Sequence, residues 1–157
     1  MKTLTRLSLV IVVGLAAFLP FATAVQAKAV VYYFTGTESC VPTSMGDWTY
    51  PDGNIHIRGM IFDCTENSDS PFVAGRNTVV LNANLKAFPG AMLGGIGPMW
   101  GTWEMANWEG TFEGVMTADG GIYHAQGRGK GTYTGMKEWL DTDHGVFNGR
   151  ILDPHGG

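Results

Sequence analysis

The sequence predicts an all-β fold, a small antiparallel β-barrel of about eight strands in a single domain. A short pattern of Gly, Thr or Val, an aromatic residue, any residue and Gly recurs in the C-terminal half of the chain. β-Branched and aromatic segments alternate with turn residues at spacings of roughly 10 to 15 residues, as in barrels and sandwiches. No stretch has the apolar spacing of an amphipathic helix of three turns.

The Gly–aromatic pattern predicts which face of the sheet points inward. Complete copies stand at Gly110–Gly114, Gly131–Gly135 and Gly145–Gly149, with a partial copy at Gly101–Trp103. Side chains alternate between the two faces of a strand, so each aromatic shares its face with glycines, which allow tight curling. We expect this face inside and the charged face outside; the alternative is a polar lumen with an aromatic exterior. The expected interior aromatics are Trp103, Phe112, Tyr133 and Phe147.

The remaining strands are predicted from composition and alternation. They are Ala29–Phe34, Trp48–Tyr50, Ile55–Asp63, Thr78–Ala87 and Ile122–Gln126. In Ile55–Asp63 the strict alternation sets Ile55, Ile57 and Ile61 against His56, Arg58, Met60 and Phe62. Polar segments between the strands are expected to be loops or turns; these are Thr35–Gly46, Thr65–Pro71 and Asp141–Asp143.

Residues 1–27 have the layout of a secretory signal peptide. Lys2 and Arg6 precede the apolar run Leu9–Ala22, and Val25 and Ala27 are small residues suited to cleavage. The alternative is a membrane anchor that is retained. Cleavage leaves residues 28–157 as the β-barrel domain, secreted or periplasmic, with no membrane span after cleavage.

Cysteine and charge content narrow the class of protein. Cys40 and Cys64 are the two cysteines, and export favours a disulfide between them over free or metal-binding thiols. Acidic residues number 14 against 10 lysines and arginines. An acidic chain of this kind argues against nucleic acid as a partner.

The run Gly127-Arg128-Gly129-Lys130-Gly131-Thr132-Tyr133-Thr134-Gly135 carries a resemblance to a known family. It resembles the Gly-x-Gly-x-aromatic-x-Gly strand of allene oxide cyclase-like and dirigent-like barrels, which are calycin-like. The resemblance covers about the last 50 residues and consists of the Gly–aromatic rhythm. It implies an eight-stranded barrel with a hydrophobic cavity that binds an apolar or phenolic molecule. No catalytic residue can be matched one by one.

Aromatic residues at a barrel mouth often line a binding site. The candidate ligand-binding aromatics are Trp100, Trp103, Trp108 and Tyr133, while His56 and Arg58 would form a polar end if their face points inward. The Gly-rich segment Pro89–Pro98 would be either a lid over this mouth or a plug that belongs to the core.

Other polar groups are weaker candidates for chemistry. Asp141–His144 combines two carboxylates and an imidazole, which suits either a divalent cation or a polar turn. Four glutamates could serve acid–base chemistry if two of them faced one cavity, namely Glu104, Glu109, Glu113 and Glu138. The first three lie opposite the aromatic face, so they are expected outside, as is His124. We expect no metal and no cofactor.

The sequence supports three functional hypotheses. The first is a protein that binds or carries a small apolar ligand in the barrel. The second is a cyclase-like enzyme acting on an apolar substrate, which needs a titratable group inside the barrel. The third is a structural or interaction module whose barrel is filled by side chains. Catalytic residues, ligand identity and oligomeric state stay open.

Overall fold

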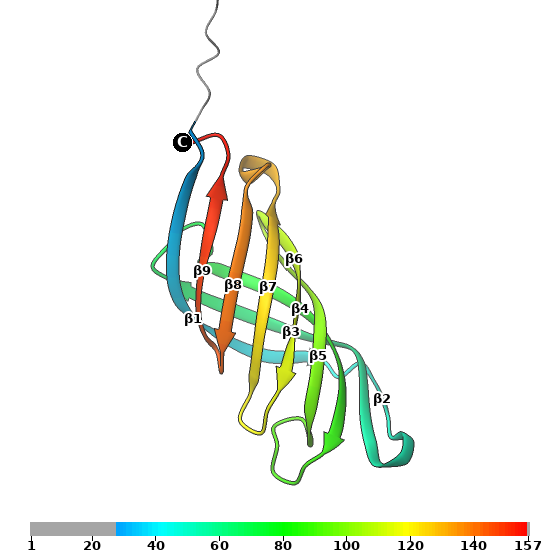
Figure 1. Cartoon of the computed structure of the whole chain (residues 1–157). Coiled ribbons are helices and arrows are strands. Elements are labelled where there is room, and N and C mark those ends of the chain that lie inside the picture. Colours follow the sequence, from blue (N-terminus) through cyan, green and yellow to red (C-terminus); the bar gives the residue numbers. More distant parts are fainter. Residues whose placement is uncertain (1–27, 157) are drawn as a thin grey trace, which may run out of the picture.

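The computed structural model describes residues 28–156 as a single antiparallel sheet of nine strands, eight of which close into a barrel (Figure 1). The strands are β1 (Val30–Ser44), β2 (Asp47–Thr49), β3 (Asn54–Ser68), β4 (Gly75–Ala87), β5 (Gly95–Met105), β6 (Trp108–Met116), β7 (Gly121–Gly129), β8 (Lys137–Asp143) and β9 (Val146–Asp153). Two single-turn 3₁₀ helices interrupt them, η1 (Pro51–Gly53) and η2 (Gly131–Tyr133). The predicted fold class is therefore confirmed.

Strand β1 closes the barrel because it pairs with two neighbours. Its first half runs beside β9, with Val30 opposite Asp153, and its second half runs beside β3, with Gly36 opposite Ser68. The short β2 pairs with β3 outside this closed ring. Figure 1 shows β3 and β4 crossing behind β7, β8 and β9, so the barrel has two layers with the core between them.

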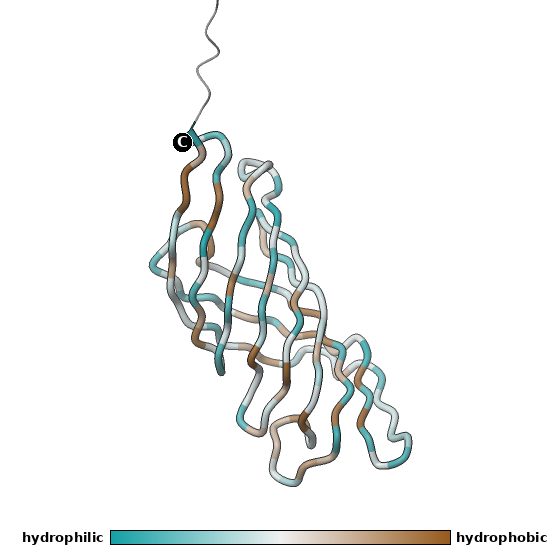
Figure 2. The backbone as a smooth tube through the Cα atoms, in the orientation of Figure 1, coloured by the Kyte–Doolittle hydropathy of each residue, from teal (hydrophilic) through white to brown (hydrophobic). Residues whose placement is uncertain are grey.

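The Gly–aromatic pattern makes the inward face, as predicted. The rings of Trp103, Phe112 and Phe147 are buried, and each covers a glycine on a neighbouring strand. A Cβ added at Gly127 would stand 2.6 Å from the Trp103 ring, and one at Gly101 would stand 2.6 Å from Phe112. The glycines therefore leave room for the rings. Hydrophobic and hydrophilic residues are interspersed along the strands, consistent with two faces (Figure 2).

The copy of the pattern at Gly131–Gly135 is not a strand, which corrects the prediction for this segment. Strand β7 ends at Gly129, and the chain then turns through η2. Gly131 and Gly135 have φ values of +56° and +94°, so these glycines serve a turn. Tyr133 still packs against the core, but from η2.

A bulge in β3 corrects the predicted faces of Ile55–Asp63. The pairing of β3 with β4 shifts between Ile57 and Met60, where Gly59 has a φ of +67°. The extra residue changes the phase of the strand. Met60 is therefore buried together with Ile55 and Ile57, and Ile61 is turned outward.

Three segments predicted as loops or turns are wholly or mostly strand. The polar segment from Thr35 belongs to β1, which continues to Ser44, and β3 continues to Ser68. Asp141–Asp143 is the end of β8, and the turn into β9 is formed by His144 and Gly145. The alternation Val79, Leu81, Ala83, Leu85 in β4 is confirmed as the inward face.

An aromatic cluster closes the barrel beside the β3–β4 loop. The Phe72 ring lies 5.2 Å from that of Tyr32 and 5.5 Å from that of Tyr133. Trp108 is fully buried beside Tyr133 and donates a 2.8 Å hydrogen bond from Nε1 to the Phe72 carbonyl. These aromatic side chains occupy this end of the barrel.

The predicted disulfide between Cys40 and Cys64 is present. It indicates an oxidising compartment, since the cytosol keeps thiols reduced. The expected signal peptide, residues 1–27, lies outside the described residues. Among residues 28–156, no helix has the length and hydrophobicity that crossing a membrane requires.

Candidate functional site

The barrel contains a partly open cavity of about 150 Å³. Most of its wall is apolar, with methionine and leucine side chains facing aromatic rings; among the apolar lining residues are Phe62, Val79, Leu81, Leu93, Met99, Trp103, Phe112, Met116, Ala125 and Leu140. Phe112 and Tyr123 pack with ring centroids 5.3 Å apart. An apolar cavity of this size matches a small ring compound, because engineered cavities of about 150 Å³ bind benzene.

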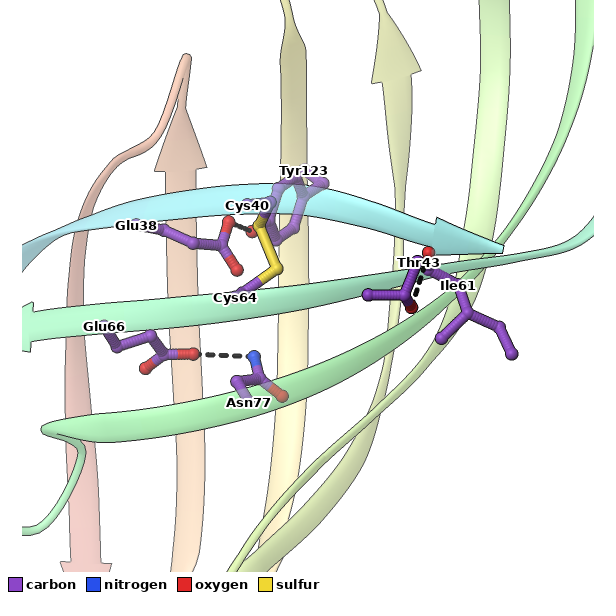
Figure 3. Close-up of a disulfide and its surroundings, with 8 residues drawn as sticks. All are labelled: Glu38, Cys40, Thr43, Ile61, Cys64, Glu66, Asn77 and Tyr123. Atoms are coloured by element: carbon purple, nitrogen blue, oxygen red, sulfur yellow. Dashed lines mark hydrogen bonds between the residues drawn. A yellow bond between two sulfur atoms is a disulfide. The ribbon is translucent and has the colours of Figure 1, made fainter. Parts of the chain in front are cut away.

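One side of the cavity is polar. Glu38, Glu66, Asn77 and Tyr123 line it from four different strands (Figure 3). The Tyr123 hydroxyl donates a 2.5 Å hydrogen bond to Oε2 of Glu38. The Asn77 amide donates a 2.7 Å hydrogen bond from Nδ2 to Oε1 of Glu66. Two carboxyl groups, each with one donor, therefore face an otherwise apolar space.

Strand register explains why the two carboxyl groups meet. Cys40 of β1 lies opposite Cys64 of β3, and the antiparallel register then places Glu38 opposite Glu66. Residues two apart share a face of a strand, so the side chains of both glutamates lie on the same face of the sheet as the disulfide. The disulfide holds the seam between β1 and β3 beside this pair (Figure 3).

Burial determines the protonation of these groups. The pKa of Glu66 is raised to about 8: burial raises it most, the nearby Glu38 carboxylate adds to the rise, and the hydrogen bond from Asn77 opposes both. Burial also raises the pKa of Glu38, against the bond from Tyr123. The pKa of the Tyr123 phenol is raised as well, first by burial and then by Glu38, so this hydroxyl stays a donor.

A third carboxyl group lies deeper in the barrel. Glu138 of β8 is 2% exposed, and burial followed by the charge of Glu66 raises its pKa to about 8. Within the described part of the chain, Glu138 Oε2 has no hydrogen-bond partner, and neither has Nε1 of the adjacent Trp103. Asn77 Oδ1, on the cavity wall, is likewise unpaired. Buried polar atoms are rarely left unpaired, and of these three residues Asn77 belongs to the polar wall of the cavity.

The β4–β5 loop forms the accessible wall of the cavity. Leu93 is buried against the cavity, whereas Met92 lines it and is 67% exposed. The Met92 amide donates a 3.0 Å hydrogen bond to the Ala118 carbonyl in the β6–β7 turn. This loop occupies part of the predicted Pro89–Pro98 segment, whose last residues belong to β5. The loop combines the two predicted roles: Leu93 is part of the core, as in a plug, whereas the exposed Met92 covers the cavity, as in a lid.

The predicted ligand-binding residues are divided among three places. Trp103 lines the cavity. Trp108 and Tyr133 belong to the aromatic cluster that closes the barrel. Trp100, His56 and Arg58 lie on the outer face, where the Arg58 guanidinium stacks 5.1 Å from the Trp100 ring. His56 and Arg58 therefore do not form a polar end to this cavity, because their side chains alternate with the inward Ile55 and Ile57.

The other candidate groups are mostly on the surface. Glu104 and Glu109 form ion pairs with Lys130 and Arg128 on the outer face, and Glu113 is exposed there too, as predicted. His124 is exposed and pairs with Asp141, which confirms its outward placement. Asp143 pairs with His144, while Thr142 points into the barrel. The Asp141–His144 segment therefore does not converge on a single point.

The metal-ligating potential of the cavity is limited by the disulfide. The carboxylate of Glu38 lies within 4.8 Å of the sulfur atoms of Cys40 and Cys64. Metals bind the thiolate form of cysteine, so sulfurs joined to each other are poor ligands. Glu38 alone does not make a metal site with the oxidised pair.

Sequence reasoning missed the polar side of the cavity. Glu38 and Glu66 lie in segments predicted to be loops, and the sequence assigns no face to Glu138. Tyr123 precedes the outward His124 in β7 and lines the cavity. The cysteines carried a usable signal: in an antiparallel pair joined at Cys40 and Cys64, the residues at positions 38 and 66 must be opposite each other.

The chain matches no family model, no curated protein and no solved structure. The resemblance to allene oxide cyclase-like and dirigent-like barrels therefore stays a prediction. In the cavity, protonated carboxyl groups can donate hydrogen bonds and ionised carboxylates can pair with a cation.

Proposed function

We propose that this is a secreted or periplasmic protein that binds a small, mostly apolar molecule inside its barrel. The observation that carries the proposal is the apolar cavity of about 150 Å³ with the unpaired Oδ1 of Asn77 on its wall. Ligand sites are concave and mostly apolar, with a few placed polar groups that orient the ligand. The apolar body would contact Leu81, Met99 and Phe112, and its polar end would face Asn77 and Glu66.

The size of the cavity limits the ligand. A space that holds benzene admits a molecule of roughly six to ten non-hydrogen atoms. A ligand would enter beside Met92, which lines the cavity and is exposed to solvent. A protein with this cavity would carry or sequester small ring compounds or short-chain molecules.

An enzymatic role is the second candidate, and Glu66 is the observation that favours it. A buried carboxyl group with a pKa of about 8 is protonated at neutral pH and can act as a general acid. The Glu66 side chain lines the cavity, where it would contact a bound apolar substrate. Chemical conversion distinguishes the two roles: an enzyme converts the bound molecule and Glu66→Gln stops the conversion, whereas a carrier returns its ligand unchanged.

Native mass spectrometry of protein purified from its own host tests the binding proposal. We expect an additional mass of a small molecule on the wild-type protein. Ala125→Leu, which adds a side chain within the cavity, should abolish this mass, while Gln126→Leu, the same side chain on the exposed face of β7, should keep it. An unliganded mass for the wild type, together with no binding of small aromatic probes in solution, would contradict the proposal.

A further inference from the structure

We propose that the ligand is an organic cation, an ammonium group attached to a small apolar body, and that its charge is neutralised by the Glu38–Glu66 carboxyl pair. This inference rests on the proposed function, because it assumes that the cavity is a ligand site. It specifies the chemical class that the polar wall recognises.

Charge balance is the first argument. Three glutamates, Glu38, Glu66 and Glu138, are inside the barrel, and the described lining of the cavity contains no lysine, arginine or histidine. Buried carboxyl groups are normally paired with a cation or bound to a metal. Like charges directly opposite each other on adjacent strands are also destabilising. A cationic ligand would supply the partner that the chain itself lacks.

Unpaired acceptor atoms are the second argument, independent of the acidic cluster. Asn77 is 4% exposed, and its Oδ1 lacks a hydrogen-bond partner among the described residues although it lines the cavity. Its Nδ2 is already bonded to Glu66. An ammonium group carries three donors and no acceptor. An ammonium group bound beside Asn77 would supply a donor to this oxygen and a charge partner to the carboxyl pair.

The apolar wall favours an organic cation over a metal ion. Phe112 and Tyr123 line the cavity, and aromatic rings attract cations. Met99 and Met116 add polarisable thioethers that adapt to an irregular ligand. Mg²⁺ and Ca²⁺ need six or more oxygen ligands, whereas most of this wall is hydrocarbon. An alkyl or aryl ammonium fits both, because its charged group can pair with the carboxyl groups while its hydrocarbon part contacts the apolar wall.

Binding of an ammonium would change the protonation of the site. Glu66 is faced by Glu38 from β1, Asn77 from β4, Tyr123 from β7 and Glu138 from β8. At neutral pH the free protein holds the proton of the Glu66 carboxyl group. When the ammonium enters with its own proton, the carboxyl O–H bond breaks, the carboxylate pairs with the ligand, and one proton is released to the solvent. A neutral ligand would release none.

Isothermal titration calorimetry with benzylamine and benzyl alcohol tests the inference, since both carry the same ring and differ in charge. At pH 7 we expect benzylamine to bind at least about tenfold more tightly, the size of one charge-assisted hydrogen bond. Titrations in two buffers of different ionisation enthalpy should show about one proton released per benzylamine and none per benzyl alcohol. Benzoate, with the opposite charge, should not bind.

Variants assign the preference to the carboxyl pair. Glu66→Gln and Glu38→Gln should each reduce the preference for benzylamine markedly while benzyl alcohol still binds. Glu113→Gln, on the exposed face of β6, is the matched control and should keep the preference. A fold check by circular dichroism accompanies each variant.

The outcomes separate this inference from the proposed function. Equal or tighter binding of benzyl alcohol, or a preference for benzylamine that survives both glutamine variants, would overturn the cationic ligand and leave the binding cavity standing. Binding of neither probe, together with an unliganded native mass, would overturn both. Tighter binding of benzylamine with proton release, lost in Glu66→Gln, would support both.

Discussion

Glu38 of β1 and Glu66 of β3 are directly opposite each other across the seam that closes the barrel, next to the Cys40–Cys64 disulfide. Two acidic residues in this relation would repel each other if both were ionised. Their burial favours the protonated forms, so the seam is stable when at least one of them holds a proton. The chemistry of the cavity and the stability of the fold are therefore linked.

The first prediction is that the protein is more stable at acidic than at alkaline pH. Glu66 and Glu138 have pKa values near 8 when folded, against an ordinary value of 4.5. Between these values the folded protein binds more protons than the unfolded chain, so the free energy of unfolding falls as pH rises. The full contribution is present below pH 4.5 and lost by about pH 8. Urea unfolding should give less stability at pH 9 than at pH 5, with a loss of up to about 1.4 kcal/mol per pH unit for each of the two groups.

Glu66→Gln should flatten this profile by up to about 1.4 kcal/mol per pH unit, because a glutamine accepts the same bond from Asn77 and does not titrate. The variant should therefore be more stable than the wild type at pH 9. Glu113→Gln on the outer face should leave the profile parallel to that of the wild type. A wild-type stability that rises steadily from pH 5 to pH 9 would refute the buried protonated carboxyls.

The second prediction concerns the disulfide. The Cys40→Ala, Cys64→Ala double variant should lose about 3–4 kcal/mol of stability, because the bond restricts a loop of 24 residues in the unfolded chain. It also joins β1 to β3 where the barrel closes. Chemical unfolding with and without a reductant measures this difference. In the double variant the reductant should have no effect, and a wild type equally stable in both conditions would contradict the prediction.

The third prediction tests the glycine beneath Trp103. A Cβ at Gly127 would stand 2.6 Å from the Trp103 ring, so Gly127→Ala should destabilise the protein by about 1–3 kcal/mol through overpacking. Trp103→Phe makes room, so the double variant should recover part of the loss. Thermal unfolding of the four proteins in this cycle gives the coupling. Strictly additive losses would show that the ring and the glycine do not share the space.

The fourth prediction separates Arg58 from the cavity. Its guanidinium donates hydrogen bonds to the carbonyls of Ile57 and Ala83 and stacks on Trp100, all on the outer face. Arg58→Ala should lower the free energy of unfolding by about 1–2 kcal/mol, because the bulge in β3 loses these bonds. Benzyl alcohol binding should be unchanged by the substitution. A loss of benzyl alcohol binding without a loss of stability would show that Arg58 takes part in ligand binding.

The sequence predicts the wall of the barrel better than its polar side. Alternation identifies inward residues wherever the core is hydrophobic, as in Val79–Leu85 and in the aromatics Trp103 and Phe112. In β8 the inward positions include Glu138 and Thr142, so the pattern there is polar on both faces and resembles a loop. The second half of β1, which includes Glu38, is also polar on both faces and for this reason is not predicted as a strand.

Two local features also escape a reading by periodicity. The bulge at Gly59 shifts the phase of β3, so positions beyond it exchange faces. Gly131–Gly135 has the spacing of a strand but forms a turn, because two of its glycines adopt positive φ values. Neither choice is set by nearby residues alone; strand pairing in the folded barrel decides both.

The double pairing of β1 also decides how the domain can be attached to other molecules. Val30 is paired with Asp153, so the described chain begins and ends side by side, at the end of the barrel farthest from the β4–β5 loop in Figure 1. A tether joined at either position would point away from Met92. The protein could thus be fixed to a surface or a fusion partner, or have its ends joined and reopened elsewhere, with the approach to its cavity still free.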